Sequence, residues 1–157
     1  MDGSTEISER AGMSDTILLV EDCEDDVFFM ERAMSAAGLI STLQVALDGQ
    51  QALDYLGGMG RYADRKIYPL PCLVLLDLKL PHVLGLDVVK WIRSRPDFQT
   101  LPVIILTSSG ERSDLERAYR LGANSFMVKP SDFDDLVELA KCFGNYWFKY
   151  SIIPRIT

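Results

Sequence analysis

The chain has 157 residues and a mass of 17.6 kDa, with 48% hydrophobic and 25% charged residues, which is typical of one globular domain with its own core. Its net charge of −7 and isoelectric point near 4.7 argue against nucleic acid or an anionic membrane as partners. The three cysteines have no disulfide or zinc spacing, and neither a membrane-spanning run nor a signal-peptide pattern is visible, so we expect a cytoplasmic protein.

Three parts of the chain differ in pattern. Residues 1–14 are polar and aperiodic, which predicts a flexible N-terminal tail. Residues 15–150 alternate short apolar runs with segments of helical periodicity, which predicts one domain. Residues 151–157 form a short C-terminal tail.

The apolar runs predict buried strands, and the periodic segments end at glycine or proline, as helices do. Ser131 and Asp134 predict a capping box at the start of the last helix. In chain order we expect strand 16–20, helix 25–37, strand 42–46, helix 50–56, strand 72–76, helix 85–95, strand 102–107, helix 113–121, strand 125–128 and a helix from 132 to about 148.

The segment 58–71 is longer than the usual connection of about two to six residues in α/β proteins. It is either a docking feature or a neutral insertion, and we favour the insertion. The alternation of strands and helices, with right-handed crossovers, predicts an α/β domain with a doubly wound parallel sheet between two helical layers.

Functional side chains follow several of these strands. Glu21 and Asp22 follow the first strand, Asp77 the third and Lys129 the fifth, while Thr107 ends the fourth. Because the carboxyl ends of parallel strands share one edge of the sheet, we expect these side chains to meet there. Each residue alone has an ordinary explanation as a cap or a solvated side chain, but their joint occurrence favours a site.

Three clustered carboxylates repel one another, at about 4 kcal/mol per pair for a separation of ~4 Å and an effective dielectric constant of ~20. A divalent cation removes this repulsion, and oxygen ligands favour Mg²⁺ over zinc. Such a site attracts phosphoryl oxygens, and Asp77 is an oxygen nucleophile. The single histidine, His82, follows a proline in a predicted loop, so the pattern favours a site that holds a phosphoryl group over a fast hydrolase.

The motifs LLVEDCEDD, LLDLKLP, VIILTSS and FMVKP, in this order, resemble the receiver domain of two-component response regulators from about Thr16 to about Trp147. The segment 58–71, RLGANSFMVKP and the NYW near the end are similar to single-domain regulators associated with phytochrome-type sensor kinases. This resemblance implies a flavodoxin-like fold with strand order 2-1-3-4-5 and a role in phosphorelay signal transduction.

The resemblance also implies roles for the acidic residues. Asp77 is the implied acceptor of a phosphoryl group from a kinase phosphohistidine. Glu21, Asp22, Asp77 and the backbone carbonyl of Lys79 are the implied ligands of Mg²⁺. Glu21 stands where aspartate is frequent in this family.

Three further positions match the family pattern. Thr107 is the implied switch hydroxyl, and Lys129 is implied to pair with a phosphoryl oxygen. Phe126 occupies the aromatic switch position, where tyrosine is common, so no hydroxyl is available there. The resemblance implies a cis Lys129–Pro130 peptide bond.

A phosphoacceptor of this kind is a signalling protein and not a conventional enzyme, since it phosphorylates itself and loses the group slowly at most. The implied partner is a sensor histidine kinase of the phytochrome type. We expect a changed surface as the output, either a homodimer through helix 113–121, strand 125–128 and the last helix, or a docking face. The candidate aromatic residues for such a surface are Phe143, Tyr146, Trp147 and Phe148.

Three rival functions fit less well. A phosphatase of the haloacid dehalogenase type needs a second aspartate where Lys79 stands, and the acidic segment after the first strand would repel the phosphate of FMN. A receiver-like scaffold that is never phosphorylated remains the main alternative.

Overall fold

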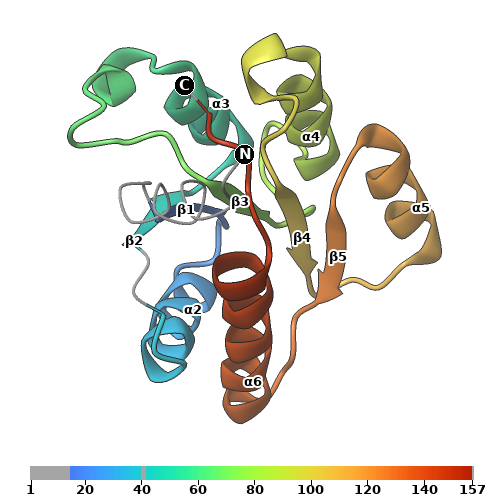
Figure 1. Ribbon diagram of the computed structural model, residues 1–157. Helices are drawn as coiled ribbons and strands as arrows, with labels where there is room; N and C mark the ends of the chain where they lie inside the picture. Colours follow the sequence, from blue (N-terminus) through green and yellow to red (C-terminus); the bar gives the residue numbers. More distant parts are fainter. Residues whose placement is uncertain (1–14, 40–41, 157) are drawn as a thin grey trace, which may run out of the picture.

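The computed structural model describes residues 15–39 and 42–156 (Figure 1). In this part of the chain, five strands form a parallel sheet in the order β2-β1-β3-β4-β5. The strands are β1 (Thr16–Val20), β2 (Thr42–Ala46), β3 (Leu73–Leu76), β4 (Val103–Thr107) and β5 (Ser125–Val128). This order confirms the predicted flavodoxin-like, doubly wound fold. The predicted tail 1–14 lies outside the described residues.

Helices cover both faces of the sheet, with α2 and α6 on one face and α3, α4 and α5 on the other (Figure 1). The α-helices are α2 (Glu24–Ala36), α3 (Gly49–Gly57), α4 (Gly85–Ser94), α5 (Arg112–Leu121) and α6 (Phe133–Gly144). Short 3₁₀ turns occupy Gly60–Ala63 and Pro96–Phe98, and a π-helical turn, Asn145–Tyr150, extends α6. None of the helices in the described residues has the length and apolar character that crossing a membrane requires.

The two faces of each strand supply two separate hydrophobic clusters. Ile17 and Leu19 of β1 pack toward α2 and α6, whereas Leu18 and Val20 pack toward the α3–α5 layer. All four side chains are buried, which explains why the strand reads as a continuous apolar run and not as an alternating one.

The register of the sheet brings the ends of distant strands together. Val20, the last residue of β1, is paired with Ala46 of β2 on one side and with Leu76 of β3 on the other. The residues that follow β1 and β3 therefore emerge side by side. Farther along the sheet, Thr107 of β4 is paired with Val128 of β5.

The start of the last helix differs from the prediction. The capping box of Ser131 and Asp134 is wrong, because Asp132 is the N-cap and its side chain accepts a hydrogen bond from the Asp134 N–H at 2.7 Å. Asp132 has an extended backbone there, with φ −95° and ψ 134°, which aims its carboxylate at the free N–H groups of the first turn.

The segment 58–71 is packed against the domain. Tyr62 is buried, and its ring lies 5.2 Å from that of Tyr55 in α3 and 5.0 Å from that of Tyr68, between ring centroids. Arg65 donates to the carbonyls of Tyr55 and Leu56 at 2.7 and 2.8 Å. These two carbonyls lie in the last turn of α3, where they lack a partner within the helix. The segment therefore extends the core, and this explains its aromatic composition.

The aromatic residues near the C-terminus mostly serve the core as well. Phe143 is only 5% exposed, so its proposed place on a docking face is wrong. Trp147 and Phe148 are half-buried against the cluster under α2 and α6, and Tyr146 alone of the four is well exposed. After α6 the chain runs past the sheet toward α3, where Ile156 packs against the opposite cluster (Figure 1).

A half-buried arginine links three segments on the α3–α5 side. The Arg93 guanidinium donates to the carbonyls of Gly122 and Leu101 at 2.9 and 2.8 Å and to the Asn124 side chain at 2.8 Å. It also donates to the carbonyls of Phe98 and Gln99, both at 3.1 Å. The end of α4, the 3₁₀ turn and the end of α5 thus share one cation.

Replacing Arg93 by alanine should lower the free energy of unfolding by about 2–3 kcal/mol, because several carbonyls lose a charged donor at once. Urea denaturation followed by circular dichroism measures this change. Arg95→Ala is the matched control, since Arg95 is exposed and its guanidinium lies over the Trp91 ring, and it should cost less than about 1 kcal/mol. Equal losses for the two variants would contradict the assigned role of Arg93.

Candidate functional site

The predicted acidic group is present at the carboxyl edge of the sheet. Glu21, Asp22 and Asp77 each place one carboxylate oxygen within 4.8 Å of the others. Glu21 and Asp77 are buried, at 3% and 6% exposure, whereas Asp22 is exposed. A cation at this group would have buried ligands on one side and access to solvent on the other.

The backbone sets this arrangement. The Asp77 N–H donates to the carbonyl of Val20 and the Glu21 N–H to that of Ala46, both at 3.0 Å, so the sheet pairing continues one residue past the strand ends. Asp77 Oδ1 accepts from the Lys79 N–H at 3.1 Å, and Glu21 Oε1 accepts from the Cys23 N–H at 3.1 Å. Both carboxylates are therefore oriented by their own following loops.

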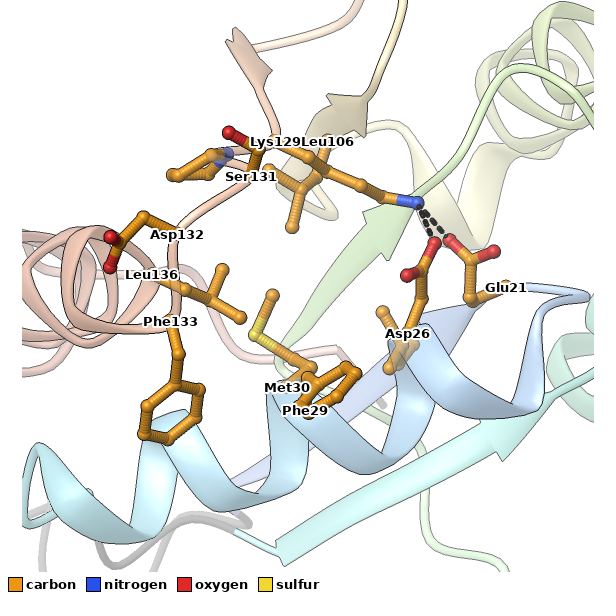
Figure 2. A pocket seen from close by; sticks show the side chains of 12 residues that line it. Glu21, Asp26, Phe29, Met30, Leu106, Lys129, Ser131, Asp132, Phe133 and Leu136 are labelled. Carbon is orange, nitrogen blue, oxygen red and sulfur yellow. Dashed lines mark hydrogen bonds and ion pairs between the residues drawn. The ribbon is translucent and has the colours of Figure 1, made fainter.

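Lys129 reaches into the acidic group from the end of β5. Its Nζ donates to Asp77 Oδ2 at 2.8 Å, to Asp26 Oδ2 at 3.1 Å and to Glu21 Oε2. Burial alone would lower the pKa of this ammonium, but the hydrogen bonds to Asp77 and Glu21 outweigh it and raise the pKa above its usual range. Lys129 therefore carries its charge at neutral pH. Figure 2 shows its side chain extended between the loop after β5 and α2.

The two buried carboxylates differ in their affinity for a proton. Burial raises the pKa of Glu21, and the neighbouring Asp77 raises it further, to about 7, against the opposing effect of Lys129. Burial also raises the pKa of Asp77, but hydrogen bonds with Glu21, Lys129 and the Lys79 N–H outweigh it and hold this pKa below its usual range. Asp77 is thus the ionised member of the pair and Glu21 the member that takes up a proton first.

The remaining predicted residues lie around this group. Thr107 is fully buried at the end of β4, where its Oγ1 accepts from the Ser109 N–H at 3.4 Å and its carbonyl accepts from the Lys129 N–H at 2.8 Å. Phe126 of β5 is half-buried and packs against the cluster under α3–α5. The side chain of Lys79 is exposed.

One expectation at the site is wrong. The Lys129–Pro130 peptide bond is trans, as are all the peptide bonds of the described residues. Trans is the lower-energy form of most bonds that precede proline.

A cavity of about 250 Å³ opens beside the acidic group, between α2 and the start of α6 (Figure 2). Met30, Leu106 and Leu136 form part of its apolar wall, and the exposed rings of Phe29 and Phe133 lie 6.4 Å apart between centroids. Glu21, Asp26 and Lys129 line the end near Asp77.

Sequence reasoning missed the contact of Asp26 with Lys129 and the cavity. In the sequence, Asp26 is one of three acids in the first turn of α2, where a negative charge complements the positive end of the helix dipole. No local pattern distinguishes it from Glu24 and Asp25 in the same turn. The contact with Lys129 spans 103 residues of sequence.

Two known proteins are similar to this chain over most of its length. The probable methanogenesis regulatory protein FilR2 of Methanothrix harundinacea is 37% identical over 141 residues, which cover 88% of this chain and 86% of FilR2. Response regulator Rcp1 of Synechocystis is 29% identical over 148 residues, covering 94% of this chain and 99% of Rcp1.

Two solved structures share the fold over most of their length. The Mn²⁺-bound form of Rcp1 aligns with a TM-score of 0.80 and 30% identity, covering 89% of this chain and 99% of that one. The phosphorylated cyanobacterial phytochrome response regulator RcpA aligns with a TM-score of 0.82 and 29% identity, covering 89% and 98%. The sequence model of the response regulator receiver domain family matches residues 17–141 of this chain. The acidic group, the lysine among its carboxylates and these alignments lead to one conclusion: the chain belongs to the receiver domain family of two-component response regulators.

Proposed function

We propose that Asp77 accepts a phosphoryl group from the phosphohistidine of a sensor histidine kinase, with Mg²⁺ bound by Glu21, Asp22, Asp77 and the carbonyl of Lys79. The observation that carries this proposal is the position of the Asp77 carboxylate at the carboxyl edge of the sheet, grouped with Glu21 and Asp22 and 2.8 Å from the Lys129 ammonium.

The donor set suits a hard divalent cation, since three carboxylates in close reach offer only oxygen ligands. When bound, Mg²⁺ supplies positive charge that offsets the acids and the phosphoryl oxygens. The metal in the Rcp1 structure is Mn²⁺, an ion with the same preference for oxygen ligands. The Asp22 carboxylate, exposed to solvent, leaves an entry path to this position.

In the proposed transfer, a carboxylate oxygen of Asp77 attacks phosphorus while the bond between phosphorus and the donor imidazole nitrogen breaks. The electron pair of that bond stays on the imidazole, and the phosphoryl group becomes an acyl phosphate on Asp77. Lys129 is already within hydrogen-bonding distance of Asp77 and offers its charge to a phosphoryl oxygen. The chain supplies orientation and charge, and the donor supplies the reactive bond.

Thr107 and Phe126 are the proposed switch. Among the described residues, the Thr107 hydroxyl oxygen accepts a long hydrogen bond from the Ser109 N–H at 3.4 Å. Turning the hydroxyl toward a phosphoryl oxygen would give its proton a charged acceptor. Shifting the ratio of active to inactive conformations from 1:99 to 99:1 requires about 5.5 kcal/mol of difference in binding free energy between the two states. New contacts of the phosphoryl group with Thr107, Lys129 and the metal can contribute much of this difference. Phe126 has no hydroxyl, so its part is limited to packing.

The cavity between α2 and α6 is a suitable place for the kinase to dock, because it opens next to Asp77 and has exposed aromatic rings at its rim. A kinase of the phytochrome type is the proposed donor, since the relative RcpA is a phytochrome response regulator. The rival function, a scaffold that is never phosphorylated, shares the fold and differs only in whether Asp77 reacts.

Acetyl phosphate with Mg²⁺ should add one phosphoryl group to the wild-type protein and none to Asp77→Asn, because the amide is not a nucleophile of comparable strength. Intact-protein mass spectrometry measures the product. Asp135→Asn, which removes an exposed acid from α6, should be modified like the wild type. A wild-type protein without added mass would favour the scaffold.

Mg²⁺ should raise the melting temperature of the wild-type protein, by the equivalent of about 2.7 kcal/mol at a hundred times its dissociation constant. Asp22→Asn should remove most of this shift, because it deletes one of the three carboxylates of the acidic group at an exposed position. Asp25→Asn is the control, since it removes the same charge three residues later. The idea fails if Asp22→Asn and Asp25→Asn respond to Mg²⁺ alike.

A homodimer through α5, β5 and α6 also belongs to this proposal. Tyr119 and Val128 are 49% and 51% exposed on α5 and β5, which leaves apolar area for a second copy. Sedimentation velocity should show a larger species when beryllofluoride and Mg²⁺ are added, and Tyr119→Glu should prevent it. Met59→Glu, an exposed position in the segment after α3, should not. A monomer under both conditions would count against the dimer.

A further inference from the structure

Asp26 is the acceptor of Lys129 that stands outside the acidic group. The Lys129 ammonium has three donor hydrogens, and three carboxylates receive them: Asp77, Glu21 and Asp26. Asp77 and Glu21 belong to the group that would hold the cation, whereas Asp26 lies on α2. No donor of Lys129 is left for a further acceptor unless one of these contacts breaks.

The three contacts differ in how easily they break. Glu21 and Asp77 are buried, with side chains 3% and 8% exposed, while the side chain of Asp26 is 45% exposed. An ion pair with a half-exposed carboxylate is weak, because water solvates that carboxylate when the pair opens. The contact with Asp26 is therefore the one that Lys129 can give up at least cost.

A phosphoryl group on Asp77 would need a donor from Lys129. Its oxygens and the Asp26 carboxylate are both anionic acceptors, so they compete for the same ammonium. The negative charge of Asp26 at 3.1 Å from Nζ also lies close to the place where the phosphoryl charge would arrive.

We infer that Asp26 is a positioning residue of the phosphoacceptor site: it holds the Lys129 ammonium toward α2 and competes with the phosphoryl group for it. This inference rests on the proposed function. Asp26 would thereby lower the stability of the phosphorylated state. The contact between Asp26 and Lys129 is accessible to solvent, because both residues line the cavity (Figure 2).

The test compares the affinity of the Mg²⁺-loaded protein for beryllofluoride, which occupies the place of the phosphoryl group, by isothermal titration calorimetry. Asp26→Asn should bind it about two- to fivefold more tightly than the wild type, the range that a half-exposed ion pair allows. Asp25→Asn removes the same charge from the neighbouring residue and should change the affinity less. Asp26→Glu, which keeps a carboxylate, should remain near the wild type.

A second comparison separates competition for Lys129 from a general effect of charge. In a Lys129→Met background, Asp26→Asn should bind beryllofluoride no more tightly than Asp25→Asn, because the contested donor is gone. If the difference between the two variants persists there, the inference is overturned. Should Lys129→Met not fold, the comparison of Asp26→Asn with Asp25→Asn in the native background still decides.

The outcomes distinguish this inference from the proposed function. A wild-type protein that does not bind beryllofluoride overturns the proposed function and the inference with it. A wild-type protein that binds, together with an Asp26→Asn variant that binds no more tightly than Asp25→Asn, overturns the inference alone.

Discussion

The ion pairing of Lys129 with buried carboxylates is the interaction on which the site depends. Glu21 and Asp77 lie close together with little access to water, and two such charges are costly to bury without a counter-charge. Lys129 provides that counter-charge. The raised pKa of Glu21 reduces the remaining repulsion, because Glu21 can be neutralised by a proton. Asp77 can therefore remain ionised, which is the state that its proposed reaction requires.

The same strands build the core and the site. Their alternating side chains fill two hydrophobic clusters, so every strand is locked in register by the helices on both faces. The positions of the residues that follow β1, β3 and β5 are therefore set by the register of the sheet. A rigid sheet thus supports polar side chains whose positions must be accurate to a fraction of an ångström, while the loops that carry them remain open to a partner.

Aromatic residues illustrate the limits of sequence reasoning for surfaces. The apolar stretch at the end of the last helix suggested a docking face, yet Phe143 is buried there and the half-buried Trp147 and Phe148 cover the core. The exposed rings beside the acidic group are instead Phe29 in the second turn of α2 and Phe133 at the start of α6. Exposure depends on what lies opposite, and a sequence pattern does not contain that partner.

Local patterns in the sequence determined the strands, most helix ends and the meeting of Glu21, Asp22, Asp77 and Lys129 at one edge, because hydrophobic period, capping glycines and parallel topology act over short stretches or whole layers. The tertiary structure alone decided that Asp26 shares Lys129 and that Glu21 and not Asp77 takes up a proton first. These features depend on distances between side chains and on their access to water. Both are set only when segments more than a hundred residues apart pack together.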